Sequence, residues 1–337
     1  IIPLYKEHGV SFVEHINGEY AIALLDEKIN CLFLYSDVFA TKPLFYSVEE
    51  EHLGIASYSS ELVKLGFTKI NQVPASTVVS IDLKTLKIKQ NQHSKFSLKE
   101  FKTSYDDCIE AFTNAMLIRC NDKISVGLSS GHDSGAILQW CLDNKPKANF
   151  YYVYTKSENS DIMSRRISEC QKSMLNVETI DYYNFQKIFN LVESAYLNTN
   201  MEQYKLYKNE CSTLMLSTIM RKTKKDNIDI FISGQGSDEI LSNYLLDATF
   251  YKNIQTTFPW NNFYEGKNKF YINQLEYIGG SFGIEVRYPF LDKLFVQEFL
   301  NLANYLKTAK YKSVISEYLK IKKLPTNNKK VGMKIKK

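Results

Sequence analysis

The sequence lacks the features that would place the protein in a membrane or in an oxidising compartment. No apolar run approaches the roughly 20 residues that a membrane-spanning helix needs, and the N-terminus does not have the basic-then-apolar pattern of a signal peptide. The six cysteines are scattered without a C-x-x-C pair, which argues against a zinc site and against a disulfide framework. We therefore expect a cytoplasmic protein with no membrane partner.

Two common phosphate-binding fingerprints and a strong charge are also missing. The G-x-x-x-x-G-K-[ST] loop is absent, and no glycine loop has the dinucleotide spacing. The 42 Lys and Arg residues give a net charge of only +5 against 37 Asp and Glu, spread along the chain until a basic tail at Lys320–Lys337. Such a mild excess is not the electrostatic footprint of a nucleic-acid-binding protein, so we expect no nucleic-acid partner.

The sequence does contain enough apolar material for two cores. It has 337 residues, of which 44% are hydrophobic and 23% charged. Short alternating runs within Glu19–Ser57, continued at Val78–Lys89, predict a meander-like antiparallel sheet. The polar stretch Gln90–Glu100 predicts a linker. We therefore place one domain at residues 1–95 and a second at residues 101–337.

After the predicted linker, apolar strands alternate with helices. The expected strands are Ile124–Leu128, Phe150–Tyr154, Val177–Ile180 and Ile228–Ser233, and the expected helices include Tyr105–Arg119, Ala136–Leu142 and Ile162–Leu175. This alternation predicts a parallel sheet wrapped by helices. Ligands of such sheets lie beyond the carboxyl ends of the strands, which is where two glycine loops occur in this chain.

The first glycine loop, Ser129–Gly135 (SSGHDSG), follows a buried strand and opens a helix. Unpaired N–H groups and the macrodipole at a helix N-terminus favour an anion, and phosphate is the natural one. Asp133 would repel phosphate unless a cation such as Mg²⁺ lay between them. Taken alone, the loop is equally well explained as an ordinary turn whose Ser and Asp cap the helix.

The second glycine loop, Ser233–Glu239 (SGQGSDE), also follows a strand and also carries an acid, Asp238. Two carboxylates from two strand ends can hold a metal on a triphosphate between them. We therefore expect Asp133 and Asp238 to converge on one magnesium-bound triphosphate.

Together the two loops resemble the S-G-G-x-D-S and S-G-[ED]-G-[AS]-D-E motifs of the asparagine synthetase family. Gly283–Asp292, GIEVRYPFLD, is similar to that family's E-[AV]-R-x-P-F-L-D block. In the N-terminal half, Ile16–Asp26, Leu32–Tyr46 and Ile55–Leu65 resemble segments of the family's glutamine amidotransferase domain. The resemblance implies an α/β synthetase domain with a parallel sheet, of the adenine nucleotide α-hydrolase-like (PP-loop) type. It also implies part of an N-terminal α+β Ntn-type amidotransferase domain.

The resemblance implies an ATP-dependent ligase that activates a carboxylate as an acyl-adenylate and forms an amide, with ATP and Mg²⁺ as cofactors. The implied metal ligands are Asp133 and Asp238. Lys330, in a block similar to R-x-K-x-G-F, is implied to stabilise charge on the departing phosphates, although a solvated lysine in a basic tail stays open. The implied ATP and pyrophosphate site comprises Leu128, Ser129, Ser130, Gly131, His132, Asp133, Ser134, Val153, Ser233 and Gly234.

The sequence also departs from the family pattern. The family's amidotransferase nucleophile is an N-terminal cysteine, whereas this chain starts with Ile1 and its first cysteine is Cys31. We expect the nucleophile to lie upstream, so that the chain as given does not hydrolyse glutamine. Gln235 stands at the catalytic position where asparagine-forming relatives carry a glutamate, and a glutamine cannot act as a general base at neutral pH.

Ser130, His132 and Gly135 are further departures, all within the first loop. Serine restricts the backbone more than glycine where a positive φ is required. We expect His132 to face solvent rather than to take part in catalysis. In the third block, we expect Glu285 and Arg287 to form a buried pair that fixes a loop near the site.

Several functions stay open at this point. The first is asparagine formation with glutamine or ammonia as nitrogen donor, and the second is amidation or cyclisation of another carboxylate in a secondary metabolite or a glycan. A catalytically inactive nucleotide-binding homologue belongs to a different class. A pyrophosphatase acting on nucleic acid shares the first loop but does not explain the N-terminal match. The expected partners are a small-molecule carboxylate and glutamine or ammonia, and a homodimer is left open.

Overall fold

The computed structural model describes residues 1–154, 158–173, 175–180, 211–244 and 254–326. Among these residues the chain divides into two compact units, the first containing residues 1–96 and the second beginning at Ser97. No helix in these ranges is long and apolar enough to cross a membrane.

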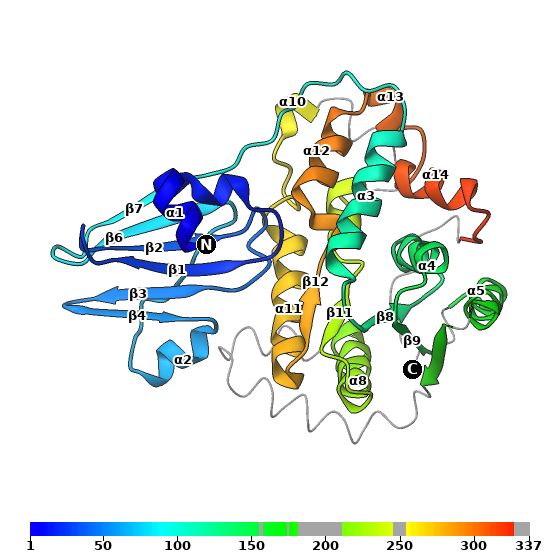
Figure 1. The fold of residues 1–337 in the computed structure, drawn as a ribbon, viewed down its shortest axis with the longest axis horizontal. Coiled ribbons are helices and arrows are strands. Elements are labelled where there is room, and N and C mark those ends of the chain that lie inside the picture. The colour runs from blue at the N-terminus through cyan, green and yellow to red at the C-terminus, as the bar shows by residue number, and fades with distance from the viewer. Residues whose placement is uncertain (155–157, 174, 181–210, 245–253, 327–337) are drawn as a thin grey trace. The chain divides into compact units, whose positions relative to one another are not determined.

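The first unit is built on two antiparallel sheets (Figure 1). The larger sheet has the order β1-β2-β6-β7, formed by Ala21–Asp26, Cys31–Ser36, Thr77–Asp82 and Ile88–Gln92. The smaller sheet has the order β4-β3-β5, formed by His52–Ala56, Phe45–Glu49 and Asn71–Gln72. The remaining elements are α1 (Ile2–His8), η1 (Gly9–His15) and α2 (Ser59–Lys64). The alternating patterns therefore do form antiparallel strands, but in two sheets rather than one meander, and β7 extends into residues predicted as linker.

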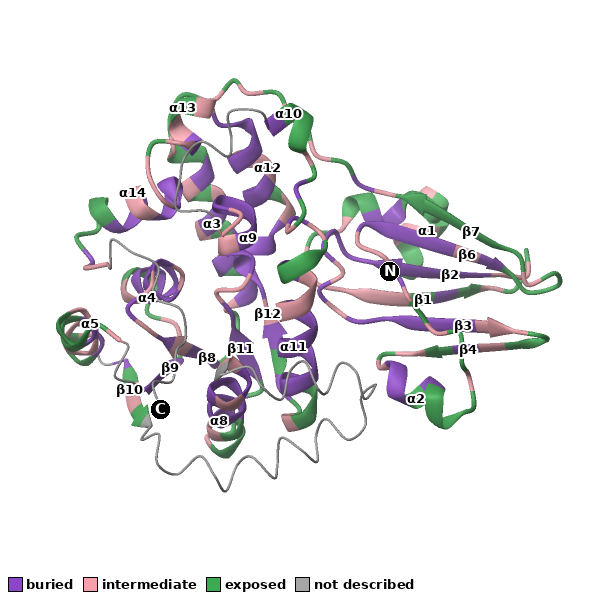
Figure 2. Cartoon of the chain, turned by 180° about the vertical axis from the view of Figure 1, so that it is seen from behind, coloured by how far each residue is buried: buried purple, intermediate pink, exposed green. Residues whose placement is uncertain are grey.

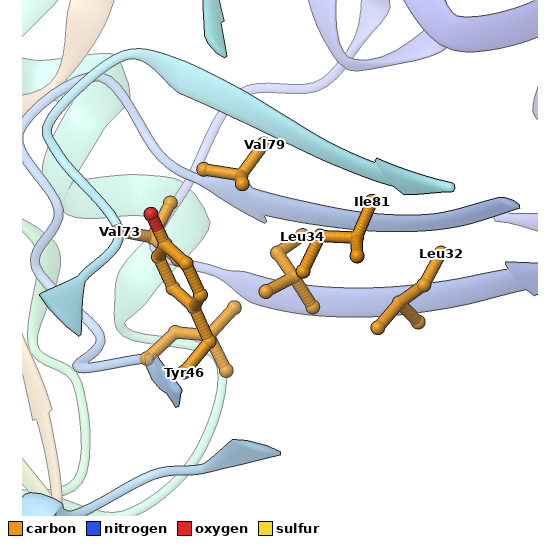
Figure 3. Close-up of a cluster of buried hydrophobic side chains, with 7 residues drawn as sticks. Leu32, Leu34, Tyr46, Val73, Val79 and Ile81 are labelled. Carbon is orange, nitrogen blue, oxygen red and sulfur yellow. The ribbon is translucent and has the colours of Figure 1, made fainter. Parts of the chain in front are cut away.

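The alternation of side chains along β2 covers both faces of the larger sheet. Leu32 and Leu34 lie on one face, in an apolar cluster with Val79 and Ile81 of β6 and with Tyr46 of β3 (Figure 3). Phe33 and Tyr35 lie on the opposite face and pack with Phe12. The cluster around Leu34 thus packs the two sheets together, and the cluster around Tyr35 packs the N-terminal helices against the larger sheet.

The second unit is a parallel five-stranded sheet with helices, as predicted from the alternating pattern. The strand order is β10-β9-β8-β11-β12, formed by Asn176–Ile180, Ala148–Val153, Ile124–Leu128, Ile230–Ile232 and Glu285–Arg287, and every adjacent pair is parallel. The longer helices are α3 (Asp106–Arg119), α4 (His132–Asn144), α5 (Ser160–Lys172), α8 (Cys211–Lys225), α11 (Gly266–Phe282), α12 (Lys293–Asn301) and α14 (Ser313–Ile321). The shorter ones are α9 (Ser237–Leu241), α10 (Ile254–Thr257), η4 (Pro289–Leu291) and α13 (Asn304–Lys307).

The order of the strands fixes where a ligand can bind. Numbered along the chain, the five strands follow the doubly wound order 3-2-1-4-5, which reverses direction between β8 and β11. These two strands are paired with Val126 opposite Ile232, so the loops that follow them leave the same edge of the sheet side by side. Figure 2 shows β8, β9 and β11 as buried strands at the centre of this unit. The two glycine loops thus flank the topological switch point, where doubly wound sheets bind their ligands.

Most helix and strand boundaries of the second unit lie within a few residues of the expected ones. Helix α4 is the main exception, because it begins at His132 rather than Ala136. The segment expected as loop is therefore partly helical, and His132, Asp133 and Ser134 belong to the first turn. Helix α5 starts after Asn159, whose side-chain oxygen accepts a hydrogen bond from the Ile162 N–H at 3.1 Å and so caps the helix.

Candidate active site

Asp133 and Asp238, from the two neighbouring loops, converge on the ammonium group of Lys312. The Lys312 Nζ lies 2.6 Å from Oδ1 and 2.7 Å from Oδ2 of Asp133. It also lies 3.0 Å from Oδ1 of Asp238. The two acids, which the sequence places 105 positions apart (238 − 133), therefore share one cation at the switch point.

The two glycine loops approach so closely because Gly234 has no side chain. A Cβ atom at this position would lie 2.8 Å from the Asp133 Cβ, a distance that two carbon atoms do not tolerate without moving. The Ser237 hydroxyl then donates a hydrogen bond to Asp133 Oδ1 at 2.6 Å, and the Tyr311 hydroxyl donates to Asp238 Oδ1 at 2.6 Å. Both acids are thus oriented by side chains from outside their own loops.

Lys312 is a buried charge, with 2% of its surface exposed. Burial alone would lower its pKa, but Asp133 and Asp238 outweigh burial and raise the pKa above its ordinary value. The side chain therefore stays protonated. Its backbone has a φ of 46°, in the left-handed region, which lysine seldom adopts. No sequence motif pointed to Lys312, since its role follows only from contacts with residues far along the chain.

The first loop is held in shape by its own hydroxyls. The hydroxyl oxygens of Ser129 and Ser134 are 2.8 Å apart, and the Gly131 N–H donates to Ser129 Oγ at 3.3 Å. Ser130, which differs from the family's glycine, has no positive φ and makes use of its side chain. Its N–H and its hydroxyl both donate to Glu158 Oε2, at 2.8 Å and 2.5 Å. The serine is thus compatible with the loop, and a carboxylate accepts hydrogen bonds at its N-terminal side.

The second loop is held by Glu239 and by a glycine that the backbone requires. Gly236 has a φ of 95°, and a Cβ there would lie 2.4 Å from the Leu291 side chain. The Gly236 N–H donates to Glu239 Oε2 at 3.0 Å, and the Tyr244 hydroxyl donates to Glu239 Oε1. Burial raises the pKa of Glu239. Because both oxygens of this carboxyl accept hydrogen bonds, one from the loop and one from Tyr244, Glu239 holds the backbone around Gln235 in place.

Gln235 lies between the two held ends of the second loop. Its N–H donates to the Ser233 hydroxyl at 3.0 Å. Its side-chain nitrogen is buried and has no partner at hydrogen-bonding geometry among the described residues. The amide is still close enough to Glu239 to oppose, in part, the rise that burial causes in the pKa of that carboxyl. The position thus presents an amide, which donates hydrogen bonds but does not accept a proton at neutral pH.

The expectation that His132 faces solvent is wrong. Only 7% of its surface is exposed, because α4 begins at this residue and carries the ring against Tyr311, at a centroid distance of 5.5 Å. Burial lowers the pKa of His132 to about 4. The imidazole is therefore neutral at pH 7 and packs against Tyr311.

Those other predicted site residues that the structure describes lie at the same edge of the sheet. Leu128 and Val153 are the last residues of β8 and β9, and Ser233 directly follows β11. The side chains of all three are buried. Lys330 and its block lie outside the described residues.

The third block contributes one partner, Asp292, to a buried ion pair, which is not the expected pair. Glu285 is half exposed, with 52% of its side chain accessible, and its carboxylate pairs with Arg287 at 2.8 Å. The buried pair is Arg119 with Asp292, at 2.8 Å and with 3% and 1% of their side chains exposed. Arg287 also donates to the Arg119 carbonyl at 2.7 Å, so the block joins α3 to the end of β12. The block therefore has a structural role, as predicted, but the buried pair that provides it is Arg119 with Asp292 rather than Glu285 with Arg287.

The donor set at the switch point fits a magnesium ion that is shared with phosphate. The described residues contain no group of three His, Cys, Asp or Glu side chains able to hold a metal by themselves. Mg²⁺ in nucleotide sites is commonly held by one or two carboxylates together with phosphate oxygens. Asp133 and Asp238 are two such carboxylates, and their shared contact with the Lys312 ammonium shows that they face the same point.

Comparison with known proteins agrees with the resemblance drawn from the motifs. Residues 1–64 match the family model of a glutamine amidotransferase domain. A putative glutamine-hydrolyzing asparagine synthetase of Methanocaldococcus jannaschii is 24% identical over 337 residues, covering 90% of this chain and 58% of that protein. The glutamine-hydrolyzing asparagine synthetase of Gallus gallus is 24% identical over 354 residues, covering 95% of this chain and 62% of that protein. The predicted similarity to asparagine synthetases is thereby confirmed.

The chain spans about half the length of the curated relatives that it matches. A glutamine-hydrolyzing asparagine synthetase of Bacillus subtilis, for example, is 22% identical over 83% of this chain but over 43% of its own length. Among solved structures, an NH3-dependent NAD synthetase from Campylobacter jejuni matches 48% of this chain and 77% of its own, with 15% identity and a TM-score of 0.30.

Proposed function

We propose that this chain, a relative of asparagine synthetases, carries the ATP-using half of an amide-forming ligase, with glutamine or ammonia as the source of nitrogen. The observation that carries the proposal is the convergence of Asp133 and Asp238 at the switch point of a doubly wound sheet. The relatives that match most of the chain, being named as asparagine synthetases, support it.

The proposed reaction has two steps. In the first, a carboxylate oxygen of the acceptor attacks the α-phosphorus of ATP, and the bond to the β-phosphate oxygen breaks to release pyrophosphate. In the second, the nitrogen of ammonia attacks the acyl carbon, AMP leaves with the bridging oxygen, and a proton is lost from nitrogen. The first step gathers negative charge on the departing phosphates, so preorganised donors and cations at the two loops lower its barrier.

The residues around the switch point are assigned parts in the first step. The serine hydroxyls and backbone N–H groups of Ser129–Ser134 would hold pyrophosphate at the start of α4. Asp133 and Asp238 would hold Mg²⁺, which supplies charge neutralisation on the phosphate oxygens when it is bound. Lys312 is a fixed ammonium within reach of both acids, and it orients them.

The acceptor carboxylate is the least constrained part of the proposal. Gln235 stands where asparagine-forming relatives carry a glutamate, and its buried amide nitrogen is a donor rather than a base. This observation favours a second candidate function, in which an acceptor other than aspartate is amidated or cyclised and brings its own proton acceptor.

The products of the nucleotide distinguish these proposals from others. With Mg²⁺, ATP, an ammonium salt and a panel of carboxylates that includes aspartate, we expect acceptor-dependent release of AMP and pyrophosphate in equal amounts. Supplying ammonium removes any need for glutamine hydrolysis. Release of ADP and phosphate would exclude acyl-adenylate chemistry. Calorimetric binding of Mg·ATP without turnover on any acceptor would instead favour the inactive nucleotide-binding homologue.

Two further predictions are part of this proposal and await their own tests. They are the division into domains at 1–95 and 101–337 and the role of Lys330 in stabilising the departing phosphates. Limited proteolysis addresses the first, and substitution of Lys330 by alanine with pyrophosphate release as the readout addresses the second. Sedimentation analysis decides between a monomer and a homodimer, which the sequence leaves open.

A further inference from the structure

Arg166 lies fully buried directly beneath the first glycine loop. Its exposed surface is 0%, although arginine is among the residues least often buried. One terminal nitrogen, Nη1, donates to the main-chain carbonyl oxygens of Ser129 and of Gly131, the latter at 2.9 Å. Nε and Nη2 donate to the Pro325 carbonyl at 3.2 Å and 2.9 Å. One guanidinium thus joins α5, the loop after β8 and the segment after α14.

The sequence of α4 makes room for this guanidinium at one residue. A Cβ atom at Gly135 would lie 2.5 Å from Arg166 Nη2 and 2.9 Å from Cζ. Gly135 lies in the helix at an ordinary backbone conformation, so its lack of a side chain is explained by the space that Arg166 occupies. Gly135, where the asparagine synthetase motif has a serine, is therefore linked to the burial of Arg166: the glycine leaves the space that the guanidinium fills.

The partners of Arg166 are carbonyl oxygens rather than a carboxylate. Among the described residues no acid lies within ion-pair distance of it. Burial lowers the pKa of Arg166 to about 10, and the charges of Glu158 and Asp133 oppose this shift, so the side chain stays charged at neutral pH. Its hydrogen bonds to the carbonyls of Ser129 and Gly131 fix the orientation of two peptide groups in this short loop. Its positive charge also lies behind the place proposed for pyrophosphate.

We propose that Arg166 is a positioning residue for the phosphates of the nucleotide: it fixes the carbonyls of Ser129 and Gly131 and adds a buried positive charge behind the loop. This inference rests on the proposed function, because it assumes that the loop binds pyrophosphate. It assigns to Arg166 an effect on phosphate-bearing ligands and none on the adenosine portion of ATP.

The test measures three ligands with the full chain by isothermal titration in the presence of Mg²⁺: ATP, pyrophosphate and adenosine. For Arg166→Ala we expect the affinities for ATP and pyrophosphate to fall by about tenfold to a hundredfold, the range that charged hydrogen bonds typically contribute, and that for adenosine by less than about twofold. Arg166→Lys, which keeps the charge but cannot span the same carbonyls, should recover part of the loss. Arg165→Ala, an exposed neighbour on the same helix, is the matched control and should change none of the three.

A double-mutant cycle with Gly135 separates positioning from general damage. Gly135→Ser should displace the guanidinium and weaken pyrophosphate binding, and the double variant Gly135→Ser/Arg166→Ala should be no weaker than Arg166→Ala alone, because both changes remove the same contacts. Additive losses, an equal loss for adenosine, or unchanged pyrophosphate binding in a folded Arg166→Ala would overturn the inference. If Arg166→Ala does not fold, Arg166→Lys and Gly135→Ser decide by the same criteria. A wild-type chain that binds neither ATP nor pyrophosphate would instead overturn the proposed function and this inference with it.

Discussion

Lys312 Nζ lies within 2.7 Å of both carboxylate oxygens of Asp133, so the two side chains form a closed, two-contact ion pair. Asp238 extends the pair to a triad at 3.0 Å. Since Lys312 is 2% exposed, water screens its interaction with the two acids only weakly. The relationship ties the segment before α14 to both glycine loops.

Lys312→Met is expected to destabilise the second unit. The substitution removes the cation and leaves two partly buried acids facing each other, a change that typically costs about 3–5 kcal/mol in the free energy of unfolding when a buried pair is broken. Urea unfolding followed by the fluorescence of Trp140 and Trp260, both in the second unit, measures it. Lys147→Met, at an exposed position before β9, serves as a surface control. An unchanged urea midpoint would show that the triad contributes nothing to stability.

Asp133→Asn and Asp238→Asn are each expected to abolish acceptor-dependent release of AMP and pyrophosphate. An amide keeps the shape of the side chain but removes the charge that would hold Mg²⁺, and we expect a loss of at least about a hundredfold in rate, comparable with removal of one electrostatic catalytic contact. The exposed Asp122→Asn is the control for the loss of one negative charge. Wild-type rates in either site variant would remove that acid from the proposed metal site.

Gly234→Ala should separate the two loops. The added methyl would lie 2.8 Å from the Asp133 Cβ, so one loop must move, at a cost of about 1–3 kcal/mol for overpacking. Gly127→Ala is the matched control, because the nearest atom to its Cβ would be 3.4 Å away. We expect thermal unfolding to shift and AMP release to fall for Gly234→Ala, while Gly127→Ala changes both much less. Equal effects of the two substitutions would contradict the close approach.

His132 predicts a pH dependence of stability. Its pKa is about 4 in the folded chain, because burial disfavours the charged form, and about 6.5 when unfolded. The unfolded chain therefore binds more protons between these values, so stability is full above about pH 6.5 and decreases as the pH falls to 4, by up to about 3 kcal/mol. In His132→Phe, the free energy of unfolding should therefore decrease less between pH 7 and pH 4 than in the wild type, as measured by urea unfolding.

The control for this comparison is His52→Gln, which changes an exposed histidine of the first unit. Tryptophan fluorescence reports the second unit alone, so His52→Gln should leave the pH profile of the wild type unchanged. Parallel pH profiles for the wild type and His132→Phe would show that the ring is not buried in the neutral form.

The sequence patterns were enough to predict most strands of both units, and the residues of the two glycine loops marked those loops. Strands β5 and β12 were not predicted, because each is only two or three residues long. Strand β8 falls on the expected residues Ile124–Leu128, because a short apolar run bounded by polar residues is a local property. The antiparallel strands of the first unit were also foreseen, but not their division between two sheets. That division depends on which strands pair, as when Leu34 lies opposite Val79.

What the sequence by itself determined is the order of elements and the pair of acidic loops, since periodicity, turns and helix starts are set by residues close together in the chain. Only the tertiary structure decided the contacts at the site: Lys312 reaches Asp133 across 179 positions, Tyr311 reaches Asp238 across 73, and Arg166 reaches Ser129 across 37. It also decided that His132 is buried and that the buried ion pair is Arg119 with Asp292. Burial and long-range pairing depend on how the sheet and helices pack together, and a local pattern carries no record of that packing.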